Sequence, residues 1–189
     1  MSELRTNRII PRDGLPSGSA GGIIQIVQSK FTSTKTDNVG NATDVTSYES
    51  TSGLFASITP TRADSKILID MMIHATVAQN DTILMLRLTK KVGSGSFSLI
   101  DDATGDAAAS RRRVTASMLG RTNEYTLDAF NIKYLDSPAT ASALTYSFRL
   151  SHDSGSSRNI YINRSSNDTS SYVYVPRTIS TITLYEVSG

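Results

Sequence analysis

Few residues in this chain have the types and spacing that catalysis requires. The sequence contains no cysteine and two histidines, which excludes thiolate chemistry and leaves little for a histidine base or a metal site. His152 is followed directly by Asp153 and Ser154, but the members of a catalytic triad are brought together by the fold rather than by adjacency. No Gly-x-Ser-x-Gly nucleophile elbow is present either. We therefore predict no catalytic residues and no enzyme activity.

Carboxylates gather in the segment DDATGDA, which contains Asp101, Asp102 and Asp106. Several carboxylates on one loop are what Ca²⁺ prefers, but the spacing and the terminal glutamate of a calcium-binding loop are missing. We interpret the segment as a solvated loop. The sequence thus predicts no metal ion and no cofactor.

The densest run of charge is Arg111-Arg112-Arg113. In an extended chain Arg111 and Arg113 face one side and Arg112 the other. Such a trio can bind an anion such as a phosphate or an acidic sugar, or pair with carboxylates of its own or a neighbouring chain, including the aspartates of residues 101–106. The net charge is only +2 and no wider basic stripe accompanies the run, so we expect no nucleic-acid partner.

Tyrosines near the C-terminal end are candidates for carbohydrate contact. Tyr172 and Tyr174 share a parity, so one face of an extended segment can present both rings. Arg158 and Tyr161 lie close by in the sequence. The alternative is a pair buried in the core or in an interface, where tyrosine is also favoured.

Alternating apolar residues predict that this chain is all-β. In the clearest strand Ile67, Ile69 and Met71 share one face, while the other face mixes Asp70 and His74 with apolar residues, which suits a solvated or subunit-contacting surface. Strands are predicted over residues 23–28, 48–58, 66–77, 83–92, 97–100, 111–119, 124–135, 144–151, 158–163 and 178–187, with a polar loop or ribbon over residues 29–46. Many short strands separated by turns indicate an antiparallel β-sandwich or barrel.

Two local features refine this prediction. The turn at residues 79–81 favours a hairpin between strands 66–77 and 83–92. The apolar parity switches midway through residues 124–135, from Tyr125 and Leu127 to Phe130 and Ile132, which predicts a β-bulge.

The domain organisation is an arm followed by a head. Residues 1–22 are dense in proline and glycine and carry no core pattern. The alternatives are a loose terminal tail and an extended N-terminal arm that lies against its own domain or a partner chain, and we expect the arm. Residues 23–189 form the β-sandwich head. The first residues contain no apolar stretch typical of a signal peptide, and no segment is apolar enough to insert in a membrane.

Several segments, taken in order, resemble small structural proteins of tailed bacteriophages, especially marine and cyanobacterial phages. They cover most of the chain from Leu4 to Val187. The segments are LRTNRIIPRDGLPSG with GGIIQIVQ, Ile58-Thr59-Pro60 with DSKILIDMMI, Tyr134-Leu135-Asp136-Ser137-Pro138 with ATASALTYSFRL, and STITLYEV.

The resemblance implies an antiparallel jelly roll similar to tumour-necrosis-factor-like (TNF-like) or fibre-head domains, which commonly form trimers. The implied function is a non-enzymatic virion structural protein, synthesised in the host bacterial cytoplasm, whose partners are itself as a homotrimer and the capsid or tail proteins of the virion. A capsid decoration protein is favoured because no fibre shaft is visible; the alternative is a tail or fibre component that binds a host-surface carbohydrate. In this picture the arm attaches to the virion through Leu4, Arg5, Arg8, Ile9, Ile10 and Arg12.

Overall fold

The computed structural model describes residues 22–120 and 123–189, which form eleven strands and two short 3-10 helices. The strands are β1 (Ile23–Phe31), β2 (Lys35–Val39), β3 (Ala56–Ile58), β4 (Lys66–Val77), β5 (Ile83–Val92), β6 (Ser98–Leu99), β7 (Ala116–Leu119), β8 (Asp128–Asp136), β9 (Leu144–His152), β10 (Arg158–Ile162) and β11 (Ser180–Val187). The 3-10 helices are η1 (Ser47–Ser50) and η2 (Asp101–Ala103).

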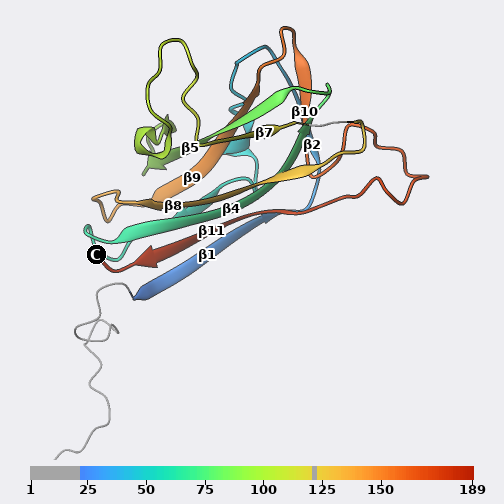
Figure 1. The fold of residues 1–189 in the computed structure, drawn as a ribbon. Helices are drawn as coiled ribbons and strands as arrows, with labels where there is room; N and C mark the ends of the chain where they lie inside the picture. The colour runs from blue at the N-terminus through green and yellow to red at the C-terminus, as the bar shows by residue number, and fades with distance from the viewer. Residues whose placement is uncertain (1–21, 121–122) are drawn as a thin grey trace, which may run out of the picture.

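The first sheet, sheet A, is built around β4. One side of β4 pairs with β8. Its other side pairs first with β11 and then with β10, so these two strands lie end to end. In the same way β1 pairs with β11 and β2 with β10. Sheet A therefore has four strand positions, in the order β8, β4, β11 with β10, and β1 with β2, all antiparallel (Figure 1).

The second sheet, sheet B, is centred on β5 and β9. These two strands pair along most of their length. The far side of β5 pairs with β7 and β6, and the far side of β9 pairs with β3 and, through one bridge, with Val45. Sheet B therefore also has four strand positions.

The path of the chain between the two sheets is that of a jelly roll. It runs from β1 and β2 in sheet A to β3 in sheet B, to β4 in A, to β5, β6 and β7 in B, to β8 in A, to β9 in B, and back to β10 and β11 in A. Eight strand positions in two packed antiparallel sheets define this architecture. The predicted jelly-roll β-sandwich is confirmed, whereas residues 1–21 of the predicted arm lie outside the described residues.

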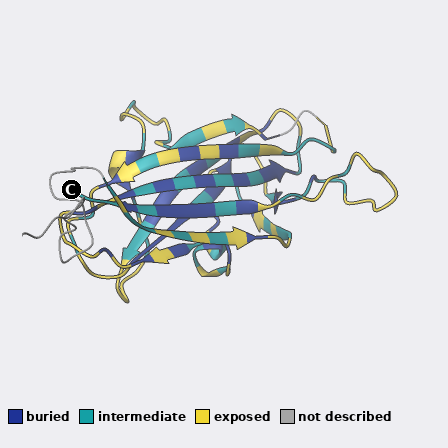
Figure 2. Cartoon of the chain, turned by 90° about the horizontal axis from the view of Figure 1, so that it is seen from below, coloured by how far each residue is buried: buried dark blue, intermediate teal, exposed yellow. Residues whose placement is uncertain are grey.

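The core lies between the sheets and follows the period of two in each strand. Ile67, Ile69 and Met71 of β4 face Leu86 and Leu88 of β5 across the sandwich interior, and all are fully buried. Burying one such side chain contributes roughly 1.5–3 kcal/mol. Figure 2 shows sheet A from its outer side, with buried residues alternating with more exposed ones along the strands. The strands thus leave every second side chain of sheet A on an outer face.

The predicted hairpin between β4 and β5 is wrong. β4 lies in sheet A and β5 in sheet B, and residues 78–82 carry the chain from one sheet to the other. Both sides of β4 are already occupied, by β8 and by β11 with β10. The strand that follows β4 therefore has no free edge to pair with and turns into the opposite sheet.

Three further predictions differ from the structure. Residues 48–58 form a strand only over β3, because η1 turns Tyr48 into the core, where its ring stacks on Phe148 with 5.0 Å between centroids. The strand predicted over residues 111–119 begins only at Ala116. β8 pairs with β4 without a shift of register, so the predicted bulge is absent and the parity switch marks the start of the strand.

Asn163 holds sheet A together where its strands are interrupted. Its amide nitrogen donates to the carbonyl oxygens of Phe31 (2.7 Å) and Ser33 (3.0 Å), between β1 and β2. Its side-chain oxygen accepts a hydrogen bond of 2.7 Å from Ser180 at the start of β11. The residue is fully buried and has a φ of 59°, a left-handed conformation that asparagine tolerates better than most residues. One side chain therefore bonds to the chain at both interruptions of sheet A, the one between β1 and β2 and the one between β10 and β11.

We expect Asn163→Ala to lower the free energy of unfolding by about 2–4 kcal/mol, because it leaves two buried carbonyl groups and a hydroxyl without partners. Urea unfolding followed by circular dichroism measures this. The control Asn131→Ala, at an exposed position of β8, should change stability by less than about 0.5 kcal/mol. Equal effects of the two substitutions would contradict the role given to Asn163.

Candidate functional site

The outer face of sheet A carries an apolar row that crosses all four strand positions. Ile26 of β1 lies opposite Tyr185 of β11, Tyr185 lies opposite Leu68 of β4, and Leu68 lies opposite Leu135 of β8. Ile26 is 58% exposed and Leu135 47% exposed. We call these four residues, with Ile23 and Val187 beside them, the outer apolar row. Contiguous exposed apolar residues mark surfaces that bind a partner.

The next positions along sheet A are polar. Lys133 of β8 forms an ion pair with Asp70 of β4, and this hydrogen bond raises the pKa of Lys133. Gln28 donates to the hydroxyl of Thr183 at 3.0 Å. A shallow hollow of about 630 Å³ lies over these residues, and Tyr185 forms part of its lining. An apolar centre beside a polar rim is the usual anatomy of a protein interface.

Glu186 of β11 lies behind the outer apolar row and points inward. It is fully buried and accepts hydrogen bonds from Gln25 of β1 (2.6 Å), from the hydroxyl of Ser65 (2.6 Å) and from the amide and hydroxyl of Thr61 (2.7 Å each). Burial acts to raise the pKa of Glu186, but the hydrogen bonds from Ser65, Gln25 and Thr61 outweigh it and hold the pKa below its ordinary value. The carboxylate therefore fixes β1, β11 and the approach to β4.

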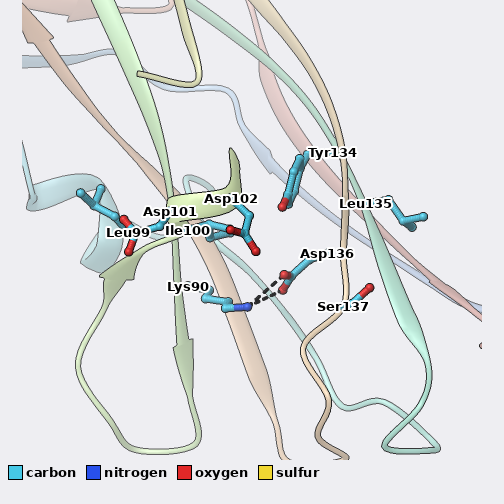
Figure 3. Close-up of a pocket in the computed structure, with 9 residues that line it drawn as sticks. All are labelled: Lys90, Leu99, Ile100, Asp101, Asp102, Tyr134, Leu135, Asp136 and Ser137. Carbon is cyan, nitrogen blue, oxygen red and sulfur yellow. Dashed lines mark hydrogen bonds and ion pairs between the residues drawn. The ribbon is translucent and has the colours of Figure 1, made fainter. Parts of the chain in front are cut away.

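A polar pocket of about 420 Å³ lies at the open side of the sandwich, between β8 of sheet A and the segment around η2 of sheet B. Lys90 Nζ donates to both carboxylate oxygens of Asp136, at 2.9 and 2.8 Å, and buried Tyr146 donates to the same carboxylate at 2.8 Å. Figure 3 shows that Tyr134, Asp102, Asp136 and Lys90 point toward one another. We call this the end pocket.

The electrostatics of the end pocket are acidic. Asp101, Asp102 and Asp136 line it against one cation, Lys90. Burial, followed by the charges of Asp136 and Asp102, raises the pKa of Tyr134. Burial and Asp136 likewise raise the pKa of Tyr146. Both phenols stay protonated near neutral pH, and the pocket favours cationic over anionic groups.

The three arginines of the run 111–113 are separated by the structure. Arg112 binds the carboxylate of Asp44 and the carbonyl of Ala42, and burial lowers its pKa. Arg113 donates to the carbonyl oxygen of Gly105 at 2.7 Å. Arg111 is exposed. The ion-pair partner is thus Asp44, rather than a carboxylate of residues 101–106.

Asp44 belongs to a network that covers the outer face of sheet B. It also binds Arg87, which lies directly opposite Arg149 of β9. Arg149 in turn donates to Glu49 of η1 at 2.6 Å. Burial, with the charges of Arg112 and Arg149, lowers the pKa of Arg87. Asp44 and Glu49 offset the positive charges of Arg87 and Arg149 on neighbouring strands. The outer face of sheet B is therefore covered by loops of the same chain.

The four residues proposed for carbohydrate contact do not form one site. Tyr172 and Tyr174 stack, with ring centroids 5.0 Å apart and planes at 12°. Tyr161 is buried in β10 beneath the guanidinium of Arg164, and Arg158 is bound to Gln79.

The Tyr172–Tyr174 pair lies in the long connection between β10 and β11, which projects beyond the sandwich (Figure 1). Both rings are about half exposed. Tyr125 packs edge-on against Tyr174, with 5.0 Å between centroids, and its hydrogen bond to Glu124 raises the pKa of Tyr125 to about 12. We call these three residues the tyrosine cluster.

His152 and Asp153, which were considered for a catalytic triad, have structural roles, since Asp153 accepts a hydrogen bond of 2.8 Å from the amide of Ile83. His152 is buried, its Nε2 lies 2.9 Å from the carbonyl oxygen of Val39, and its Nδ1 accepts from the amide of Ser154. Both ring nitrogens are therefore engaged with backbone. Within residues 22–120 and 123–189, no group of three histidine or acidic side chains is placed to hold a metal ion. The same part of the chain contains no helix long and apolar enough to cross a membrane.

Sequence reasoning missed the most distinctive of these features. The arm residues Leu4, Arg5, Arg8, Ile9, Ile10 and Arg12 lie outside the described residues. Glu186, the outer apolar row and the end pocket were not anticipated. Strand β11 did contain a signal, since Glu186 shares its parity with the buried residues Ile182 and Leu184 and an acid at an inward position needs partners.

Comparisons with known proteins give limited information. No protein-family model matches the chain, and no curated protein sequence matches it. Among solved structures it is similar to one of infectious bursal disease virus, Gx strain, with 14% identity and a TM-score of 0.36 over 97% of this chain and 42% of that one. A VP2 subviral particle of the same virus shows 10% identity and a TM-score of 0.36, over 97% and 43%. The chain spans about two fifths of the length of these viral chains.

The Glu186 network makes stability depend on pH. Because the folded-state pKa is lowered, its contribution is fully present above the unfolded pKa of about 4.3 and is lost as the pH falls through the folded value. We expect Glu186→Gln to lower the free energy of unfolding at pH 7 by about 2–4 kcal/mol. Between about pH 5 and pH 3 the free energy of unfolding should also fall less steeply with pH than in the unsubstituted protein.

Urea unfolding at a series of pH values measures both effects. Asp106→Asn, in an exposed loop, is the matched control and should follow the unsubstituted protein. An unchanged acid profile in Glu186→Gln would refute the coupling.

Proposed function

We propose that this chain is a non-enzymatic structural protein of a tailed-bacteriophage virion, a trimeric capsid decoration protein whose jelly-roll head is displayed on the particle. Residues 1–22 tie this head to a partner. The observation that carries the proposal is the outer apolar row, an interface-like surface that a lone copy leaves in water.

The sequence resemblance supports the proposal at the same place. The segments that resemble phage structural proteins are far apart in the chain and contribute most of β9 to sheet B. They also contain most of β1, the first part of β4, the end of β8 and all of β11. These four strands are neighbours in sheet A and carry the outer apolar row. The jelly roll is also an architecture that capsid domains use, an argument by analogy of fold.

The buried side chains whose types could act in catalysis are consistent with a structural role. Asp136 is bound by Lys90 and Tyr146, Glu186 by its four hydrogen bonds, and His152 by backbone groups. Each of these interactions joins strands or loops. A displayed structural protein needs such ties and needs no free base or nucleophile.

Particles of the phage that encodes this chain are expected to contain the protein in many copies. Density-gradient purification followed by mass spectrometry tests its presence, and antibodies carrying gold particles locate it by electron microscopy. We expect label on the heads, in parallel with an antibody to the major capsid protein as a control. Absence of the protein from washed particles would overturn the proposal, and label on tails alone would replace decoration by a tail role.

A second candidate is a tail or fibre component that binds a host-surface carbohydrate, and the tyrosine cluster favours it. Stacked, half-exposed rings on a projecting loop provide faces on which a sugar ring can pack. The same connection between β10 and β11 also carries Asp168, which forms ion pairs with Arg164 and Arg177.

For this candidate, replacing both Tyr172 and Tyr174 by alanine should weaken binding to host-surface polysaccharide at least about tenfold, since the stacking contacts are lost. Binding is measured by biolayer interferometry on immobilised polysaccharide. Val173→Ala, at the same loop tip, is the control and should bind as the unsubstituted protein does. Unchanged binding by the double variant would exclude the cluster as the sugar site.

A further inference from the structure

The outer apolar row is too small to hold copies together alone. It contains six residues, whereas stable interfaces use about 20–30 residues from each partner. An additional element must therefore contribute if this surface joins subunits.

The surface continues from the outer apolar row into the end pocket. The row ends at Leu135 on β8, the edge strand of sheet A. Tyr134 and Asp136, its neighbours in sequence, point to the other side of the strand and line the pocket, while Leu135 points away (Figure 3). A chain segment that crosses the row toward β8 thus reaches the pocket by passing over one strand edge.

The end pocket presents carboxylates that the described protein does not use. Among residues 22–120 and 123–189, the side chains of Asp101 and Asp102 make no hydrogen bond or ion pair; the contacts of Asp101 with Thr104 and Arg113 use its backbone carbonyl. Tyr134 contributes an aromatic ring beside Asp102 (Figure 3). Two free carboxylates and an aromatic ring favour a guanidinium group.

The segment Leu4–Arg12 has the matching chemistry. Its sequence, LRTNRIIPR, contains three arginines and no acidic residue, with Ile9 and Ile10 between Arg8 and Arg12. The isoleucines suit the outer apolar row and the arginines suit the end pocket. Apolar and charged side chains are therefore adjacent in residues 4–12, just as the outer apolar row is adjacent to the acidic end pocket.

The position of Gly22 brings this segment to the correct end of the molecule. The amide of Ser188 donates to the carbonyl of Gly22 at 3.0 Å, beside the start of β1 and the outer apolar row. The ten residues from Arg12 to Gly22 can span up to about 35 Å, whereas sheet A is roughly 14 Å wide between β1 and β8. β1 begins at this end of sheet A (Figure 1), so a segment of this reach can also extend to the outer apolar row of an adjacent copy.

We propose that residues 4–12 of one copy dock on the outer apolar row and the end pocket of a neighbouring copy, linking the homotrimer by exchanged arms. The inference rests on the proposed trimer and names another copy, rather than the capsid, as the partner of the arm. Ile9 and Ile10 cover the row, and arginines of the segment bind Asp102, beside Tyr134, and Asp101.

Because the chain lacks cysteine, introduced cysteines report this contact directly. Full-length chains carrying Ile10→Cys and differently tagged chains carrying Leu135→Cys are co-expressed and oxidised. We expect a disulfide-linked dimer that contains both tags. Leu119→Cys, at a similarly exposed leucine of sheet B, replaces Leu135→Cys in the control and should give no such dimer. Absence of the mixed dimer, or an internal disulfide in a chain carrying both substitutions, would overturn the exchange.

Light scattering separates failure of this inference from failure of the proposed trimer. We expect a trimer for the full chain, a monomer after removal of residues 1–21, and about tenfold weaker association for Asp101→Asn with Asp102→Asn. A trimer that persists without residues 1–21 overturns the exchanged arm and leaves the trimeric protein in place. A monomeric full chain overturns both.

Discussion

The hydrogen bonds that surround the buried carboxylate of Glu186 are the constraint on which the exposed side of this molecule depends. A buried charge is tolerated only when its oxygens are satisfied, and here the donors come from β1 and from the segment before β4. The register of β1, β11 and β4 is therefore set from inside the sandwich. A slip of one residue would expose Glu186 and bury Tyr185 and Val187 in its place.

The outer faces of the two sheets differ in how far loops of the same chain cover them. On sheet B, Arg87 and Arg149 lie side by side and are neutralised by Asp44 and Glu49 from the covering loops, so this face is complete within one chain. On sheet A the outer apolar row has no covering loop among the described residues. The polar pairs beside it, such as Lys133 with Asp70, make a rim around an apolar centre, so the outer face of β4 combines Leu68 of the row with polar residues of the rim.

Strand positions could be predicted from the sequence where a period of two dominates, and β4 and β5 have the expected bounds. Their partners could not, because β4 pairs with β8, β10 and β11, and β5 pairs mainly with β9, all of which come later in the chain. The same limit applies to the sites. Shared parity placed Tyr172 with Tyr174, but the partner of Arg112 is Asp44, 68 residues away, and the end pocket joins residues of both sheets.

In the trimer proposed above, the exchanged arm also determines how strongly copies associate. Ordering one backbone residue costs about 1–2 kcal/mol, so docking nine residues consumes much of what a few apolar side chains and one arginine pair contribute. The proposed trimer is then held in solution by a modest surplus of free energy that depends on salt through the end pocket. On a particle, attachment at several points raises the effective concentration of each arm near its neighbour. Weak contacts of this kind assemble reversibly in solution and become long-lived only in a lattice, which is consistent with the displayed role proposed above.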